Sequence, residues 1–151
     1  MGNSDTGKKI LVMHGPNLNT LGTREPEIYG SKTLDEINDD LKKQGKKLGI
    51  DVETFQSNHE GDIVDKIQAS VGNIDAFIIN PAAYTHTSIA IRDAVLLLEV
   101  PVIEIHLSNI YKREPFRHKS MVADVATGQI AGFGVSGYRM ALDAAVDLMA
   151  S

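Results

Sequence analysis

The stretch Ala76–Ser88, AFIINPAAYTHTS, joins a short apolar run to a polar turn and then to the expected start of a helix. Four apolar residues in succession are typical of a strand that is buried on both faces of a parallel sheet. Asn80 stands where that strand ends, and Thr87 or Ser88 can cap the helix that follows. The stretch therefore predicts a strand-to-helix unit with polar side chains at the exit of the strand.

The rest of the chain repeats this alternation of strand and helix. Four further short apolar runs predict strands at residues 9–14, 52–56, 101–107 and 129–134. Apolar residues at helical spacing predict helices at residues 33–48, 63–71, 89–98 and 137–149, with a weaker candidate at 121–125. Thr33 and Glu36 form a capping-box pattern at the start of the first of these helices. Alternation of this kind is typical of an α/β sandwich around a parallel sheet. We expect one domain over residues 9–151, preceded by a polar tail over residues 1–8.

The composition limits the classes of function. The 151 residues carry a formal net charge of −5, which gives nucleic acid no electrostatic attraction. No apolar run is long enough to span a membrane. The absence of cysteine excludes disulfides, thiolate metal sites and cysteine nucleophiles. We therefore expect a cytoplasmic protein that has no nucleic-acid or membrane partner.

Polar residues, glycines and prolines are concentrated in the loops that follow the predicted strands. The loops that precede the strands contain few of them. The rich exits are residues 14–30, 57–61, 80–88 and 106–120. Open parallel sheets bind ligands at the carboxyl ends of their strands, which is the edge where these exits meet. The distribution predicts an enzyme or a small-ligand binder. The exit at 14–30 is also unusually long for a connection, which indicates that it has a function of its own.

Two candidate groups lie in and after the run at 101–107. Glu104 and His106 are two apart on a strand and so share one face. A carboxylate beside an imidazole fixes its tautomer and favours its protonated form, which suits a general acid, although a satisfied buried polar pair is the alternative. Ser108 offers donors for an anion. Arg113 and Arg117 would form a carboxylate clamp if their segment were helical, and a solvated charged face is the alternative.

Other motifs give weaker or negative indications. Gly132–Gly137, GFGVSG, has the spacing of a dinucleotide fingerprint, but too little chain follows it, and a tight turn into the last helix explains it better. His14, His86 and His106 could converge from different strands, but they have no metal-binding spacing and no carboxylate cluster beside them, so we expect no metal. Every lysine lies in a polar context, which argues against a lysine Schiff base.

Five blocks together resemble the type II 3-dehydroquinate dehydratases. They are GPNLNTLGTREPEIYG, FQSNHEGDIVDKI, INPAAYTHTSIAIRDA, PVIEIHLSNIYKREPFRHKS and GQIAGFGVSGY. The resemblance implies a flavodoxin-like three-layer sandwich, with a five-stranded parallel sheet in the order 2-1-3-4-5. It implies a dodecamer built as a tetramer of trimers. It also implies conversion of 3-dehydroquinate to 3-dehydroshikimate in the shikimate pathway, without a cofactor.

The same resemblance implies catalytic roles for five residues. Tyr29 is the base that removes a proton beside the ketone, and Arg24 favours the tyrosinate. Asn17 helps to hold a water that stabilises the enolate. His106, oriented by Glu104, protonates the departing hydroxyl. The residues implied to bind substrate are Asn80, His86, Asp93 (from a neighbouring subunit), Leu107 (through its backbone), Ser108, Arg113 (closing with the mobile loop) and Arg117.

Simple electrostatics allows a tyrosine base near neutral pH. A free phenol has a pKa of about 10, and lowering it to about 7 requires about 4 kcal/mol. A guanidinium about 4 Å away supplies about that much at an effective dielectric constant near 20. Two other classes are possible: a non-catalytic flavodoxin-like module that binds an anionic small molecule, which would have no use for Tyr29, and a metal-dependent hydrolase, which a chelator would inactivate.

Overall fold

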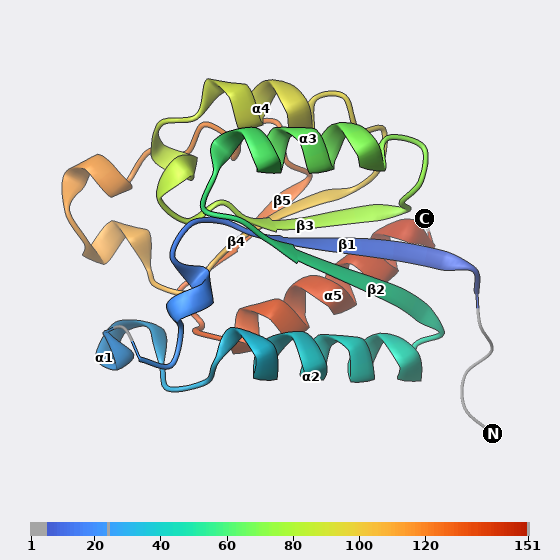
Figure 1. Cartoon of the computed structure of the whole chain (residues 1–151), viewed down its shortest axis with the longest axis horizontal. Coiled ribbons are helices and arrows are strands. Elements are labelled where there is room, and N and C mark those ends of the chain that lie inside the picture. Colours follow the sequence, from blue (N-terminus) through green and yellow to red (C-terminus); the bar gives the residue numbers. More distant parts are fainter. Residues whose placement is uncertain (1–5, 24, 151) are drawn as a thin grey trace.

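The computed structural model describes residues 6–23 and 25–150, and its centre is a sheet of five parallel strands (Figure 1). The strands are β1 (Lys8–His14), β2 (Ile50–Gln56), β3 (Ala76–Asn80), β4 (Val102–His106) and β5 (Gly128–Ala131). Their order across the sheet is β2-β1-β3-β4-β5, and every pairing is parallel. The five predicted strands and the predicted strand order are confirmed.

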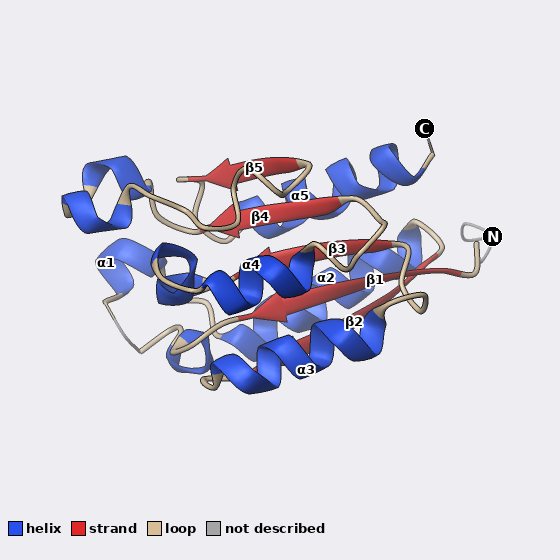
Figure 2. Cartoon of the chain, turned by 90° about the horizontal axis from the view of Figure 1, so that it is seen from above, coloured by secondary structure: helices blue, strands red, loops and turns tan. Residues whose placement is uncertain are grey.

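Helices cover both faces of the sheet. The α-helices are α1 (Pro26–Tyr29), α2 (Leu34–Lys47), α3 (Glu60–Ser70), α4 (Ile89–Val95) and α5 (Ser136–Met149). Short 3-10 helices are η1 (Leu18–Thr20), η2 (Ala82–His86), η3 (Ile110–Lys112) and η4 (Pro115–Arg117). Seen from above, α3 and α4 lie in front of the sheet, and α2 and α5 lie behind it (Figure 2). These layers make the flavodoxin-like three-layer sandwich that we expected.

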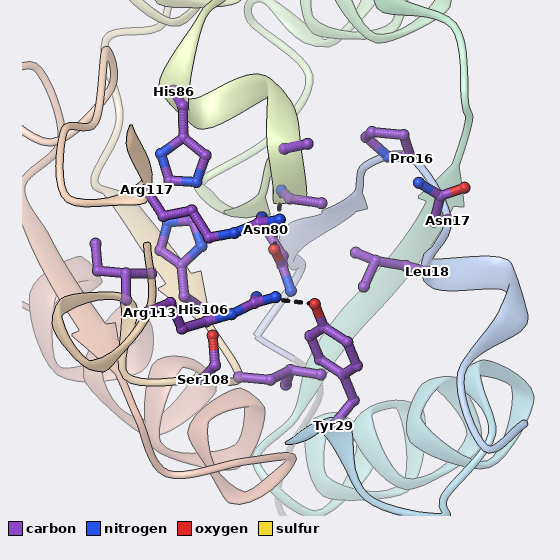
Figure 3. Close-up of a pocket in the computed structure, with 14 residues that line it drawn as sticks. Pro16, Asn17, Leu18, Tyr29, Asn80, His86, His106, Ser108, Arg113 and Arg117 are labelled. Carbon is purple, nitrogen blue, oxygen red and sulfur yellow. Dashed lines mark hydrogen bonds between the residues drawn. The ribbon is translucent and has the colours of Figure 1, made fainter. Parts of the chain in front are cut away.

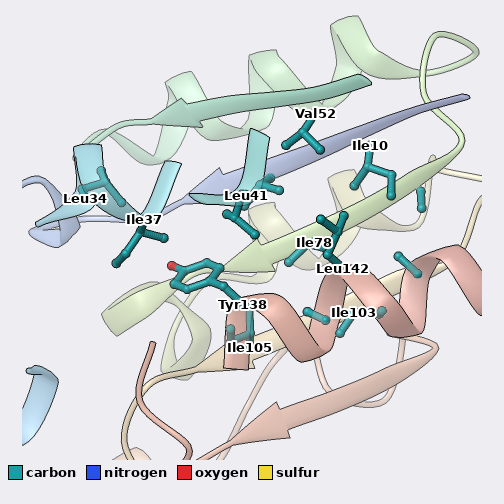
Figure 4. Packing of buried hydrophobic residues seen from close by; sticks show 14 of the residues in the cluster. Ile10, Leu34, Ile37, Leu41, Val52, Ile78, Ile103, Ile105, Tyr138 and Leu142 are labelled. Carbon is teal, nitrogen blue, oxygen red and sulfur yellow. The ribbon is translucent and has the colours of Figure 1, made fainter. Parts of the chain in front are cut away.

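The alternating side chains of the strands fill two cores, one on each face of the sheet. Ile10 and Ile78 project towards α2 and α5, where they meet Leu41 and Leu142 (Figure 4). The intervening residues, such as Phe77, project to the other face, towards α3 and α4. Central parallel strands are therefore apolar on both sides, which explains why their sequences read as continuous apolar runs.

Two sequence expectations concern helix boundaries. The capping box at the start of α2 is confirmed, because the Thr33 hydroxyl accepts from the Glu36 amide and the Glu36 carboxylate accepts from the Thr33 amide. The weak helical candidate at 121–125 is wrong. That segment forms turns, in which the Ser120 hydroxyl accepts from the amides of Val122 and Ala123 and takes the place of a helical start.

The loop after β1 is held close to the loop after β3. The Gly15 amide donates to the Asn80 carbonyl at 2.8 Å. A Cβ atom at Gly15 would lie 2.4 Å from the carbonyl oxygen of Pro81, so only glycine permits this approach. Asn17 and Ala82, which follow in the two loops, both have left-handed backbone angles, with φ of 69° and 53°. Strained backbone of this kind concentrates at functional sites.

Within the described part of the chain, none of the helices combines the length and the apolar character needed to cross a membrane.

Candidate active site

A pocket of about 540 Å³, including its open mouth, lies at the carboxyl edge of the sheet (Figure 3). Its walls come from the loops that follow β1, β3 and β4, which are three of the exits rich in polar residues. The described residues that line it are Pro16, Asn17, Leu18, Tyr29, Asn80, Ala82, Ala83, His86, His106, Leu107, Ser108, Ile110, Arg113 and Arg117. The volume suits a small molecule. The cationic side chains among these residues are arginines, and none is a lysine.

Tyr29 enters the pocket from the last residue of α1. Its hydroxyl accepts a hydrogen bond of 2.9 Å from Nη1 of Arg113, which follows η3 (Figure 3). The guanidinium carbon of Arg113 also lies 5.6 Å from the centre of the tyrosine ring. Arg24, the residue that the sequence resemblance paired with this tyrosine, lies outside the described residues.

His106 and Glu104 form a buried pair at the exit of β4. Nε2 of His106 lies 2.6 Å from Oε2 of Glu104, and the glutamate is fully buried. Burial acts to raise the pKa of the Glu104 carboxyl, but the hydrogen bonds that it accepts from His106 and from neighbouring hydroxyls outweigh burial and lower that pKa. An ionised carboxylate only accepts, so Nε2 carries the hydrogen. The other ring nitrogen, Nδ1, is then the one available to a ligand.

Three further side chains, which no sequence pattern indicated, hold this carboxylate. Thr85 donates to Oε2 at 2.5 Å, and Gln129 donates to Oε1 at 2.9 Å. The hydroxyl of Ser120 lies 2.9 and 2.8 Å from the two oxygens. Glu104 therefore accepts from four residues, with donors on both of its oxygens. Thr85 and Ser120 lie in the polar exits, whereas Gln129 comes next to Glu104 only through the register of β4 and β5.

His86 stacks beside His106. Their ring centres are 6.5 Å apart and the planes differ by 18°. Nδ1 of His86 donates to the Lys119 carbonyl at 2.8 Å, because a carbonyl oxygen only accepts. Burial lowers the pKa of His86 and so favours the neutral ring. A neutral His86 presents Nε2 as an acceptor, which suits a ligand hydroxyl.

The histidines do not converge on a metal. His14 is fully buried and bonds to Tyr138 and Asn38, away from the two stacked rings. Among the described residues, no group of three or more histidine and carboxylate side chains is arranged to hold a metal ion.

Of the remaining candidates, Asn17, Asn80, Leu107 and Ser108 line the pocket. Arg113 and Arg117 also line it, but their segment is not the continuous helix on which the clamp depended. Arg113 follows η3 in extended backbone, and Arg117 ends η4, where it pairs with Glu114 at 2.9 Å.

Asp93 does not line this pocket. It is exposed on α4, beside Arg92, which is paired with Asp124. Within one chain it is therefore not part of the site.

Comparison with known proteins decides the family. The sequence profile of the family described as Dehydroquinase class II matches residues 8–146. The chain belongs to this family. As a class II dehydroquinase it is a hydro-lyase, and the predicted resemblance is confirmed.

The relatives of this class II dehydroquinase span nearly its whole length. It is 61% identical to a 3-dehydroquinate dehydratase of Endomicrobium trichonymphae, over 94% of this chain and 99% of that protein. It is 59% identical to the catabolic 3-dehydroquinase of Emericella nidulans, over 90% of this chain and 89% of that protein. The crystal structure of a type II dehydroquinase from Propionibacterium acnes superposes with a TM-score of 0.90 at 45% identity, covering 95% of this chain and 97% of that one.

Proposed function

We propose that the pocket converts 3-dehydroquinate to 3-dehydroshikimate through an enolate, with Tyr29 as the base and His106 as the acid. The observation that carries this proposal is the pairing of the two groups with their partners in one pocket. The Tyr29 hydroxyl is hydrogen-bonded to the Arg113 guanidinium, and the His106 ring is hydrogen-bonded to the buried Glu104 carboxylate. The lining arginines and the absence of lysine among the described lining residues favour this route over an imine.

The first step is removal of a proton from the carbon beside the ketone. The Tyr29 phenolate takes the proton, and the electron pair of the C–H bond moves towards the ketone oxygen to give the enolate. Arg113, at 2.9 Å from the phenol oxygen, stabilises the phenolate. Arg24 is proposed to share this role. Asn17 lines the same pocket and is proposed to hold the water that stabilises the enolate.

The second step is expulsion of the hydroxyl group. The enolate electrons re-form the ketone and the new carbon–carbon double bond, and the hydroxyl leaves as water after His106 protonates it. For this step the His106 ring carries a hydrogen on both nitrogens: Glu104 holds Nε2–H, and Nδ1–H gives its proton to the departing hydroxyl, which leaves the neutral ring. The hydrogen bonds that four residues donate to the glutamate oxygens keep the carboxylate ionised and fixed, so the His106 ring keeps one orientation.

Substrate binding is assigned to the polar groups around this pair. The neutral His86 ring accepts from a hydroxyl, and Asn80 and Ser108 donate to oxygen atoms of the substrate. The Arg117 guanidinium and the backbone around Leu107 are proposed to receive the carboxylate.

We propose that the chain is a single catalytic domain over residues 9–151 and that it works in the cytoplasm as a dodecamer, a tetramer of trimers, in the shikimate pathway. Asp93 would then reach the site of a neighbouring subunit. Exposed apolar side chains on and after α4, at Ile89, Leu96 and Leu97, support a subunit contact at this face.

A Tyr29→Phe variant tests the assigned chemistry. It removes only the phenol oxygen, so turnover should fall by at least about 10²-fold, the usual contribution of a positioned acid or base. Binding of a ring-carboxylate inhibitor, measured by calorimetry, should be nearly unchanged. A Tyr29→Phe enzyme that keeps normal turnover would show that the base is misassigned. A wild-type protein that binds the inhibitor but forms no product would instead favour the non-catalytic binding module.

A further inference from the structure

A chain of four polar side chains, three of them buried and Asn38 half-buried, leads from the pocket into the space between α2 and α5. Nδ2 of Asn80 donates to the Tyr138 hydroxyl at 3.2 Å. That hydroxyl lies 2.9 Å from Nδ1 of His14, whose Nε2 lies 2.8 Å from Oδ1 of Asn38. His14 and Asn80 are register partners on β1 and β3, so both project from the same face of the sheet. The four side chains thus connect the pocket to α2 through one continuous path.

The donors along this path all point in one direction. The amide oxygen of Asn38 only accepts, so Nε2 of a neutral His14 carries the hydrogen and Nδ1 carries the lone pair. Nδ1 then accepts from the Tyr138 hydroxyl, whose oxygen is left to accept from Asn80. Burial lowers the pKa of His14 to about 4, which keeps this ring neutral at neutral pH.

The neighbouring hydrogen-bond partners allow the Asn80 carboxamide only one orientation. Its oxygen accepts from the Ala82 amide at 3.1 Å, and one of its two N–H groups donates to Tyr138. If the carboxamide were turned over, its nitrogen would face the Ala82 N–H, donor against donor, and its oxygen would face a hydroxyl whose hydrogen is committed to His14. The second N–H is therefore what Asn80 presents to the pocket.

We propose that Tyr138 and His14 are positioning residues that fix the Asn80 carboxamide as a hydrogen-bond donor to the substrate. The inference rests on the proposed function, in which Asn80 binds a substrate oxygen. Tyr138 is only 2% exposed and is not among the described residues that line the pocket, so it acts on substrate through Asn80 alone.

The first test is a double-mutant cycle on KM. Tyr138→Phe removes one hydroxyl and frees the Asn80 carboxamide, so KM for 3-dehydroquinate should rise about five- to tenfold with kcat nearly unchanged. In an Asn80→Ala background the same substitution should leave KM unchanged, because its target is gone. Tyr111→Phe, at a residue that is 67% exposed, is the matched control and should leave KM as it is.

His14 supplies a second pair of variants that does not alter Tyr138. His14→Gln offers an amide oxygen to the Tyr138 hydroxyl and an N–H to Asn38, so KM should stay near the wild-type value. His14→Leu offers neither, so KM should rise as it does in Tyr138→Phe.

Two results would overturn the positioning role. One is an equal effect of Tyr138→Phe on KM with and without the Asn80 side chain, as a purely structural role would give. The other is an equal KM in His14→Gln and His14→Leu. A wild-type enzyme without dehydratase activity would contradict the proposed function instead, so the two failures are distinguishable.

Discussion

The buried His14 ring predicts a loss of stability in mildly acidic solution. Its pKa is lowered from 6.5 to about 4 by burial, so the unfolded chain takes up a proton at a higher pH than the folded chain does. The contribution of His14 to the free energy of unfolding is therefore at its full value above pH 6.5, and it is lost as the pH falls towards 4. At about 1.36 kcal/mol per pH unit, the whole effect is about 3 kcal/mol, of which about 2 kcal/mol is lost between pH 7 and pH 5.

Urea unfolding at a series of pH values measures this loss directly. Protomer concentration must be held fixed, because association stabilises the folded state by mass action. His14→Gln removes the titrating ring and keeps both hydrogen bonds, so its free energy of unfolding should fall by about 2 kcal/mol less than that of the wild type over the same interval. Other groups, such as Glu104 and His86, titrate alike in both proteins and cancel in the comparison. Parallel pH curves for the two proteins would refute the assignment of a neutral buried ring.

Three substitutions test other parts of the structure. Gly15→Ala would bring a Cβ atom to 2.4 Å from the Pro81 carbonyl oxygen, so the free energy of unfolding should fall by about 2 kcal/mol in urea titrations; an unchanged midpoint would contradict the close approach. Ser120→Ala removes a donor shared by both oxygens of Glu104, and kcat should fall about tenfold in steady-state assays, whereas an undiminished kcat would show that the glutamate is held well enough without it. Arg113→Met removes the cation from the hydroxyl of the proposed base, so kcat/KM should fall by about 10²-fold. A loss smaller than about threefold would show that another group activates Tyr29.

Much of the fold was accessible from local sequence patterns. Buried parallel strands read as apolar runs because both of their faces are covered, and the capping box marked the start of α2. The helix predicted at 121–125 was wrong for a local reason. Its apolar Val122 is fully buried, but its amides bond to the Ser120 side chain instead of continuing a helix.

Contacts between residues at the exit of one strand could be predicted from the sequence. Contacts between residues on neighbouring strands could not. Glu104 and His106 share a strand, so their spacing alone places them together. Gln129 meets Glu104 only because β5 pairs with β4 in one particular register, which no local pattern encodes. Similarly, His14 ends an apolar run like any strand-exit residue. The fold alone brings it to within hydrogen-bond distance of Tyr138, which lies 124 positions away in the sequence.

The most direct test of the account is to mix the purified protein with 3-dehydroquinate, in the presence of a chelator, and to follow the ultraviolet absorbance of the conjugated enone. A dehydratase that works through Tyr29 and His106 needs no metal, so the absorbance should rise at the same rate with and without chelator. A folded protein that produces no enone absorbance would contradict the assignment. A rise that the chelator abolishes would contradict the proposed mechanism in favour of a metal-dependent reaction.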